Sequence, residues 1–426
     1  MVLRGSDRGR GVSVNRPLPE IACPTGFVTV RICFVAHSSR KGGAELVLLE
    51  TIEILQAEGI ECRVLLPDRG ELCAELEGLR VPFSLISYAH WMSRGRVPFF
   101  RRLRAALNIA AKTALVAWTI CRWKCDVVYT NTATVCVGAF AARLLGRAHV
   151  WHLHEFGFED QGLSFLFGQR FSLAAINRLS SICICVSKAL ARKYEQSVDP
   201  SKITVIYPSM HRALKSKDGG ADLQSPAFRR NARFRCVIVG ALMEGKGQEE
   251  SILALAQLKQ MGIDAELVIV GDGIPCYRRH LRNLVLSHEL TDRVVLVGPV
   301  DSAIPAMRSS DVVLVCSRRE AFGRVTIEAM LVGKPVIGAR CGATAELIRD
   351  GVNGLLYDPG DAKGLANRIK YLYESPADAN TLSRNGQVWA AGYFTRIRYG
   401  EELLTLLLRC RFDPDVKVRT SGRCTV

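Results

Sequence analysis

Ser317–Met330 reads SRREAFGRVTIEAM and directly follows the apolar run Val312–Cys316. A short β-branched run predicts a buried strand, and the residues after Gly323 have the pattern of a helix. A strand, a glycine turn and a helix in immediate succession form one unit of a parallel α/β sheet. The stretch therefore predicts such a sheet, with Gly323 and the start of the helix able to face an anion.

Two glutamates in this stretch are candidates for ligand binding. Glu320 precedes the turn, and Glu328 lies within the helix. Carboxylates accept hydrogen bonds from sugar and ribose hydroxyls. The alternative is a solvated helix face on which these glutamates pair with Arg318, Arg319 or Arg324.

The alternation of β-branched runs and helical patterns continues outward through both halves of the chain. In the first half the runs are Val30–Val35, Cys62–Leu66, Asp126–Asn131, His149–His152 and Ile182–Val186. In the second half they are Cys236–Val239, Ala265–Val270, Arg293–Val297, Val312–Cys316 and Pro335–Ile337. Most are largely apolar, as strands buried on both faces must be. We predict an α/β protein with two Rossmann-like, doubly wound parallel-sheet domains, which face each other across a ligand cleft.

The predicted domain boundaries follow the composition. A polar stretch with Gly219 and Gly220 separates the two sets of runs and has the composition of a linker. We expect a disordered lead-in over 1–28, an N-terminal domain over 29–210, a linker over 211–232, a C-terminal domain over 233–395, a helix over 396–412 that is free to return to the N-terminal domain, and a tail over 413–426.

Two further glycine-rich turns follow the first strand of each predicted domain. Ser38–Glu45 reads SSRKGGAE, and its Gly42-Gly43 pair lets backbone N–H groups approach a phosphate. Gly240–Gly247 reads GALMEGKG, where Lys246 adds a positive charge at a helix start. The second turn lacks the G-K-[ST] ending of a Walker A loop. Both also fit plain surface turns.

The strand end Trp151–Glu155 reads WHLHE, so His152 and His154 share one face of a strand. A zinc pair would need a third ligand, which the neighbouring sequence does not supply. His154 beside a carboxylate suits hydrogen bonding to a polar ligand, and a structural histidine is the alternative.

Composition limits the protein class and its location. The 426 residues carry a formal net charge of +16 and 15 cysteines, several of them within apolar runs. Buried free thiols indicate a reducing compartment, so we expect a cytoplasmic protein. Met1–Pro19 has no apolar core of a secretory signal. The charge alone would suit a nucleic-acid binder, but no reader motif accompanies it, and we expect no nucleic-acid partner.

One basic segment suggests contact with a membrane surface. The eight cations between Ala89 and Cys125 include Arg101, Arg102 and Arg104, and no acid accompanies them. Aromatic residues accompany the cations, namely Trp91, Phe99, Phe100, Trp118 and Trp123. Such a mixture favours peripheral docking on an anionic inner membrane face. The alternative is a solvated basic helix that turns Ala110, Leu115 and Trp118 toward the core.

Taken together, these motifs resemble the retaining glycosyltransferases of family 4, the group 1 type with the GT-B fold. The resemblance covers about Val30 to Leu408. Its most specific part is the E-x7-E motif from Glu320 to Glu328, followed by GKPVI and by GATAELI-x-DG-x-NGLL. The VGDG that ends at Gly273 and the KG at Lys246 also fit the family.

The resemblance implies a role for each matching residue. Glu320 would contact the transferred sugar, Glu328 would hold the ribose hydroxyls, and Lys246 would bind the diphosphate. Gly42 and Gly43 would cover the phosphate from the other domain, and His154 would lie beside the sugar. The remaining donor-binding candidates lie around the turn, namely Phe322, Gly323, Arg324 and Val325.

Two positions depart from the family pattern. Ala241 stands where the family usually has an arginine, so one phosphate-binding cation is missing. Arg318, Arg319 or Arg324 is a candidate replacement. Cys341 stands where the family often has a glycine.

The function implied is transfer of a sugar from a nucleoside diphosphate donor to a glycan or lipid-linked acceptor, with retention of configuration, as in polysaccharide biosynthesis. No metal and no other cofactor is expected, since Lys246 and helix N-termini can stabilise the departing diphosphate. The alternatives are a sugar-nucleotide epimerase, a phosphorylase, or a nucleotide-sugar-binding protein without transfer activity.

Overall fold

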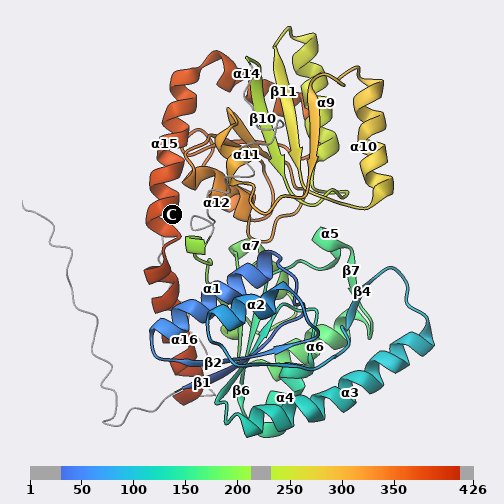
Figure 1. The fold of residues 1–426 in the computed structure, drawn as a ribbon, viewed down its shortest axis with the longest axis vertical. Coiled ribbons are helices and arrows are strands. Elements are labelled where there is room, and N and C mark those ends of the chain that lie inside the picture. The colour runs from blue at the N-terminus through green and yellow to red at the C-terminus, as the bar shows by residue number, and fades with distance from the viewer. Residues whose placement is uncertain (1–29, 213–231, 413–426) are drawn as a thin grey trace, which may run out of the picture.

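The computed structural model describes residues 30–212 and 232–412. Over these residues the chain forms two α/β domains, one above the other, each built on its own parallel sheet (Figure 1). This confirms the predicted fold class. The predicted lead-in, the predicted tail and nearly all of the predicted linker lie outside the described residues.

The sheet of the N-terminal domain has seven strands in the order β3-β2-β1-β5-β6-β8-β9, all parallel. These strands are β1 (Arg31–Val35), β2 (Glu61–Leu66), β3 (Phe83–Leu85), β5 (Val127–Asn131), β6 (Ala148–Leu153), β8 (Ile182–Cys185) and β9 (Ile203–Val205). The short strands β4 (Met92–Arg94) and β7 (Leu163–Phe165) form a separate antiparallel pair.

Helices cover both faces of this sheet, which explains why its central strands are largely apolar. Alternate residues of β1 point to opposite faces. Ile32 and Phe34 pack toward α1 (Gly43–Ala57), whereas Cys33 and Val35 pack toward α3 (Phe99–Arg122) and α4 (Val137–Leu145). The domain also contains α2 (Glu71–Gly78), α5 (Phe158–Gln161), α6 (Gln169–Leu179), α7 (Lys188–Tyr194) and a 3-10 turn, η1 (Pro200–Lys202).

The C-terminal domain repeats this plan with six parallel strands in the order β12-β11-β10-β13-β14-β15. Its strands are β10 (Phe234–Val239), β11 (Ala265–Val270), β12 (Val294–Gly298), β13 (Val312–Val315), β14 (Val336–Ala339) and β15 (Leu355–Tyr357). Its helices are α9 (Gln248–Gln260), α10 (Pro275–Ser287), α11 (Ile304–Arg308), α12 (Arg324–Leu331), α13 (Thr344–Leu347), α14 (Ala362–Glu374) and α15 (Pro376–Tyr393).

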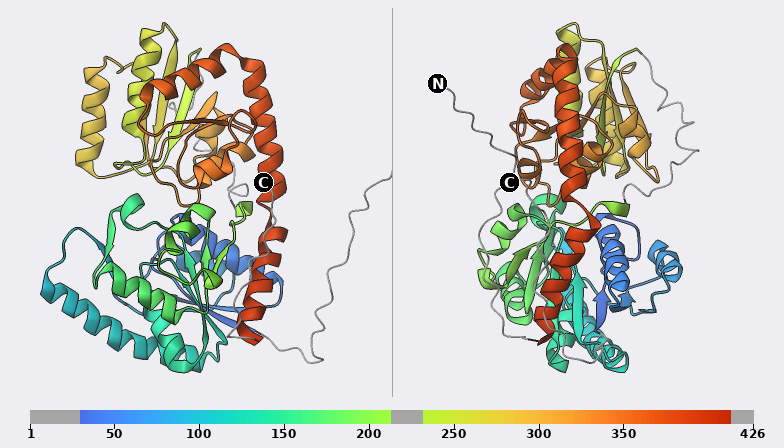
Figure 2. Two further views of the ribbon diagram at one scale, coloured as in Figure 1. Left: turned by 180° about the vertical axis from the view of Figure 1, so that it is seen from behind. Right: turned by 90° about the vertical axis from the view of Figure 1, so that its left-hand side faces the viewer.

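The last two helices run along one side of both domains. α15 packs on α12, and α16 (Arg396–Phe412) continues past the cleft to α1, β5 and β6 of the N-terminal domain (Figures 1 and 2). Tyr399 is fully buried there, and its hydroxyl lies 2.7 Å from the Thr51 hydroxyl. The end of the chain therefore completes the core of the domain with which it began.

α3 lies along the part of the N-terminal domain remote from the C-terminal domain (Figure 1). For this segment, one residue of the membrane expectation is placed wrongly, and so are the three residues of its alternative. Trp91 is buried in the core, where its ring stacks on Trp151, and is not available to a membrane. Conversely, Ala110, Leu115 and Trp118 face solvent, because Ile109, Val116 and Ile120 supply the buried face of the helix. None of the described helices is long and apolar enough to span a bilayer.

Candidate active site

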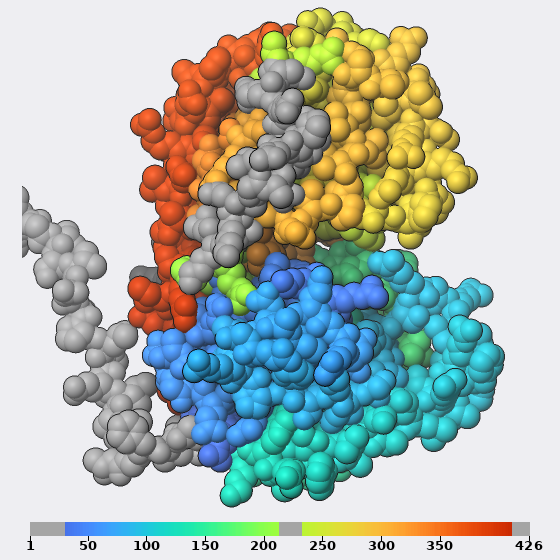
Figure 3. Space-filling model, in the orientation of Figure 1, coloured from blue at the N-terminus to red at the C-terminus, as the bar shows by residue number. Residues whose placement is uncertain are grey.

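The space-filling view shows a furrow between the two domains (Figure 3). Residues that follow the carboxyl ends of strands of both sheets line it. A cavity of about 520 Å³ lies there, large enough for a small ligand. It is lined by nine of the ten predicted site residues, namely Gly42, Gly43, His154, Lys246, Glu320, Phe322, Gly323, Arg324 and Val325. The motifs of both halves therefore converge on one site.

The loop after β1 brings the N-terminal domain close to the C-terminal domain. α1 begins at Gly43, and a side chain at Gly42 would meet the Glu45 carboxylate at 2.7 Å. At Gly43 an added Cβ would lie 3.6 Å from Arg324 Cδ of the opposite domain. The absence of side chains at this pair leaves the backbone N–H groups accessible from the cleft.

His154 follows β6 and lies at the floor of the cavity. Its Nε2 lies 2.9 Å from Asn131 Oδ1, so the Nε2–H group donates a hydrogen bond that the amide oxygen accepts. Burial, together with His152 and His37, holds the pKa of His154 well below its usual value. The ring is therefore neutral and suited to hydrogen bonding.

A buried carboxylate supports this floor and was not assigned a role from the sequence. Glu155 accepts hydrogen bonds from the backbone N–H groups of Ala133 and His154. Burial raises the pKa of Glu155 to about 7, although His37 and the bond from Ala133 oppose the rise. The sequence shows Glu155 in the WHLHE stretch, but it does not show that the side chain is buried, because the burying residues follow β5 elsewhere in the chain.

His37 is a second residue that the sequence did not identify. It follows β1, and its Nδ1 lies 2.9 Å from Glu45 Oε1. Burial opposes protonation, but the ion pair with Glu45 and the nearby Glu155 raise the pKa of His37 overall. A histidine directly after the first strand was the available signal.

Lys246 and Glu320 both line the cavity and form an ion pair, with Nζ and Oε2 3.0 Å apart. Lys246 follows β10, and Glu320 follows β13. Gly247, directly after the lysine, has φ +80°, and a Cβ there would lie 2.3 Å from the Cys316 carbonyl oxygen. Only glycine fits, so the lysine turn lies directly against the turn that carries Glu320.

The turn Phe322–Val325 presents the N-terminus of α12 to the cavity. Gly323 is the N-terminal cap and has φ +86°, a conformation that glycine adopts without strain. The free N–H groups of the first helical turn make this end attractive to an anion.

Glu328 does not line the same cavity as Glu320. It lies in an adjoining cavity of about 430 Å³, and Arg324 separates the two spaces and lines both. Arg324 Nη2 lies 3.2 Å from Glu328 Oε1, while Nη1 is buried without a hydrogen-bond partner among the described residues. Burial raises the pKa of Glu328, and Arg324 opposes this rise.

The structure also distinguishes the cations near Ala241. Arg319 and Arg324 line the cavity together with Ala241, whereas Arg318 is not among the lining residues. Arg94, from β4 of the N-terminal domain, lines it as well and was not considered as a site residue from the sequence. The described residues contain no cluster of three His, Cys, Asp or Glu side chains suited to a metal ion.

Family models match both halves of the chain. The model for glycosyl transferases group 1 matches residues 224–389, and the model for Glycosyltransferase Family 4 matches residues 41–211. The chain is a glycosyltransferase of the group 1, family 4 type. The glycosyltransferase thus carries one family signature on each side of its cleft.

Individual relatives agree with this assignment. An uncharacterized glycosyltransferase of Methanocaldococcus jannaschii is 28% identical over 266 residues, which span 62% of this chain and 69% of that protein. The N-acetyl-alpha-D-glucosaminyl L-malate synthase of Bacillus anthracis is 30% identical over 194 residues, or 45% of this chain. The match spans 50% of the Bacillus enzyme's own length.

Solved structures share the whole fold. The crystal structure of the Anabaena protein HepE in complex with UDP has a TM-score of 0.72 and 27% identity, and the match covers 89% of this chain and 100% of that chain. HepE has also been solved in complex with UDP-glucose, with a TM-score of 0.70 to this structure. These matches confirm that the glycosyltransferase has the GT-B fold.

Proposed function

We propose that this glycosyltransferase transfers a sugar from a nucleoside diphosphate donor to a hydroxyl group of a glycan or lipid-linked acceptor, with retention of configuration. The single observation that carries the proposal is the convergence of Lys246, the α12 N-terminus and the Gly42-Gly43 loop on one cavity beside Glu320. Three groups that favour an anion surround a carboxylate that can hold a sugar hydroxyl.

The donor is held in two parts. The diphosphate lies between Lys246 and the first turn of α12, and the ribose extends past Arg324 to Glu328 in the adjoining cavity. Arg324 then supplies the second phosphate-binding cation that Ala241 does not provide, because its buried Nη1 has no other described partner. The sugar lies near Glu320 and the neutral ring of His154.

Retention is the stereochemistry that the family resemblance implies. The bond from the anomeric carbon to the phosphate oxygen breaks, and a new bond to the acceptor oxygen forms on the same face of the sugar. The acceptor proton passes to the departing phosphate, whose charge Lys246 and the helix N-terminus stabilise. No metal and no separate base is required in this scheme.

UDP-glucose is the first donor to test, because the related HepE has been solved with it. Titration calorimetry with UDP tests binding, and proton NMR of the sugar product tests transfer and anomeric configuration. An α-linked product from the α-configured donor supports the proposal. Rearranged donor would instead indicate an epimerase, free sugar phosphate a phosphorylase, and binding without turnover a donor-binding protein.

We also propose that α3 contacts an anionic membrane surface. Phe100, Leu103, Leu107 and Trp118 recur at helical spacing on its solvent-facing side and are all at least 50% exposed. The nearby Arg101, Arg102 and Arg104 are exposed too. An apolar stripe with adjacent cations is the pattern of a helix that lies in the interface of a bilayer.

A further inference from the structure

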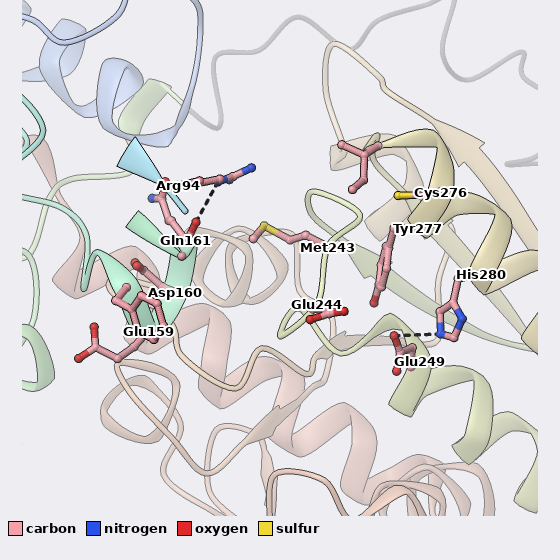
Figure 4. Close-up of a pocket in the computed structure, with 13 residues that line it drawn as sticks. Arg94, Glu159, Asp160, Gln161, Met243, Glu244, Glu249, Cys276, Tyr277 and His280 are labelled. Carbon is pink, nitrogen blue, oxygen red and sulfur yellow. Dashed lines mark hydrogen bonds and ion pairs between the residues drawn. The ribbon is translucent and has the colours of Figure 1, made fainter. Parts of the chain in front are cut away.

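A second cavity of about 540 Å³ lies beside the donor cavity, between α5 and Arg94 of β4 in the N-terminal domain and α10 of the C-terminal domain (Figure 4). The two cavities share four lining residues, namely Arg94, Asp160, Gln161 and Met243. A molecule in this second cavity therefore lies directly next to the donor site. The family motifs contribute little to it, since it contains neither Glu320, Glu328 nor Lys246.

The lining has the chemistry of a site for a sugar ring. Phe158 from one domain and Tyr277 from the other provide aromatic surface, and Met243 adds apolar surface. Such surfaces cover the C–H faces of a ring, while a few polar groups fix its hydroxyls. A volume of about 540 Å³ lies within the range of small-molecule pockets.

The polar groups of this cavity are mainly acceptors. Four carboxylates line it, from Glu159, Asp160, Glu244 and Glu249, against the single guanidinium of Arg94. Glu159 pairs with Lys193, and Glu249 lies 3.2 Å from Nε2 of His280, whereas Asp160 and Glu244 have no ion-pair partner among the described residues. Figure 4 shows Arg94, Asp160 and Gln161 on one side, with Met243, Glu244 and Tyr277 on the other. Such a surplus of negative charge favours hydroxyl donors and disfavours phosphate.

Asp160 is the carboxylate among the residues that line both cavities. One of its oxygens accepts a hydrogen bond from the Phe156 N–H at 2.9 Å, and the other, Oδ1, is buried without a partner among the described residues. A buried acceptor without a partner is unfavourable, and a hydroxyl donor of a bound molecule would satisfy it.

We infer that this second cavity is the acceptor subsite, and that it takes an uncharged sugar ring and rejects a phosphorylated one. The inference rests on the proposed function, since it names the acceptor class of that reaction. Asp160 receives a hydroxyl of the acceptor sugar at the border with the donor cavity, and Phe158 and Tyr277 cover the ring.

A cysteine in the lining can report whether this subsite is occupied. Cys276 lines the second cavity and is an exposed free thiol, and Cys121 on α3 is an exposed free thiol outside it. Alkylation of both thiols by iodoacetamide can be followed in the full chain by peptide mass spectrometry, with and without UDP. Cys121 then serves as an internal control in every sample.

Methyl glycosides of glucose, galactose and mannose are the neutral probes, and glucose 6-phosphate and mannose 6-phosphate are the charged ones. We expect at least one methyl glycoside to slow alkylation of Cys276, about fivefold at roughly four times its Kd, with Cys121 unaffected. Neither sugar phosphate should protect Cys276. Protection of Cys276 by none of the glycosides, or equal protection by the phosphates, would overturn the inference.

A matched pair of variants separates ring contact from general changes in the protein. Phe158→Ala should abolish the protection of Cys276, while Phe171→Ala should keep it; these phenylalanines are 69% and 59% exposed, and only Phe158 lines this cavity. Equal protection in both variants would contradict the assignment. UDP binding without sugar protection would refute the acceptor subsite alone, whereas sugar protection without UDP binding would refute the donor proposal alone.

Discussion

At the scale of single residues, the site contains charged groups that form ion pairs with one another. Lys246 pairs with Glu320, and Arg324 pairs with Glu328. Each pair joins a group proposed for phosphate to a group proposed for hydroxyls. Donor binding would therefore exchange two internal ion pairs for contacts with the ligand. Each substitution should then weaken binding of the part of the donor that its own residue contacts.

Glu328→Ala should weaken binding of the intact donor and of UDP while the protein stays folded. The ribose hydroxyls would lose their acceptor, which costs about 1–3 kcal/mol, or roughly a fivefold to 150-fold rise in Kd. Titration calorimetry measures this change. Glu289→Ala is the matched control, because its side chain is 88% exposed in the same domain. Unchanged UDP affinity in Glu328→Ala would remove Glu328 from the donor site.

Lys246→Ala should weaken binding of UDP as much as binding of UDP-glucose, because the contact proposed is with phosphate and not with sugar. A hydrogen bond to a charged group contributes about 1.5–3 kcal/mol, so the Kd should rise by at least about tenfold. Lys259→Ala is the matched control, because it removes the same charge from the surface of α9, outside the cleft. Wild-type affinity for UDP in Lys246→Ala would show that the lysine holds something other than phosphate.

At the scale of elements, α3 differs from the other helices of the N-terminal domain because it is apolar on two sides. Ile109, Val116 and Ile120 face the core, whereas Leu107 and Trp118 face solvent. The sequence predicted the helix and its basic character, but not which apolar residues would face inward. That choice depends on how the helix packs against α4, which the periodicity of one segment does not reveal.

Replacing Arg101, Arg102 and Arg104 by Ser should reduce co-sedimentation of the protein with anionic liposomes and leave UDP affinity intact. Each cation near an anionic surface contributes about 1 kcal/mol, so binding should fall by about a hundredfold for three. Added salt should act in the same direction, because it screens exposed charges.

The matched control for the arginine variant replaces Arg279, Arg282 and Arg384 by Ser. These arginines are also exposed but belong to the C-terminal domain, so the net charge changes equally. The control variant should sediment like the wild type. Equal binding of all three proteins to anionic and neutral liposomes would exclude electrostatic docking through α3.

At the scale of the whole molecule, the regular parts of the fold could be predicted from sequence, and the parts made by long-range contact could not. Strands such as β13 and β14 are continuous apolar runs, so their pattern suffices. The pair β4 and β7 has three residues in each strand, too few for a pattern, yet it carries Arg94 to the cleft. In the site, residues within the family motifs were found, whereas the second cavity is assembled mainly from α5, α10 and Arg94 of β4, which no motif marks.

The last helix, α16, makes the stability of the N-terminal domain depend on residues that follow the C-terminal domain. Tyr399, Leu403 and Leu406 of α16 are buried in the N-terminal core, although α15 belongs to the C-terminal domain. Between the two helices, Phe394 contacts Phe322 of the site turn and Tyr207, with ring centroids 6.2 and 6.5 Å apart. The N-terminal domain is therefore incomplete without the end of the chain.

Leu403→Ala should consequently destabilise the N-terminal domain, even though residue 403 follows the C-terminal domain in the sequence. Leu403 is fully buried, so the truncation should lower the free energy of unfolding by about 2–5 kcal/mol. Four of the five tryptophans lie in the N-terminal domain and only Trp389 in the other, so fluorescence in a Trp389→Phe background reports N-terminal unfolding in urea. The exposed neighbour Thr405→Ala should leave the urea midpoint unchanged. An unchanged midpoint in Leu403→Ala would mean that α16 adds little to the N-terminal core, and that the two domains fold without this connection.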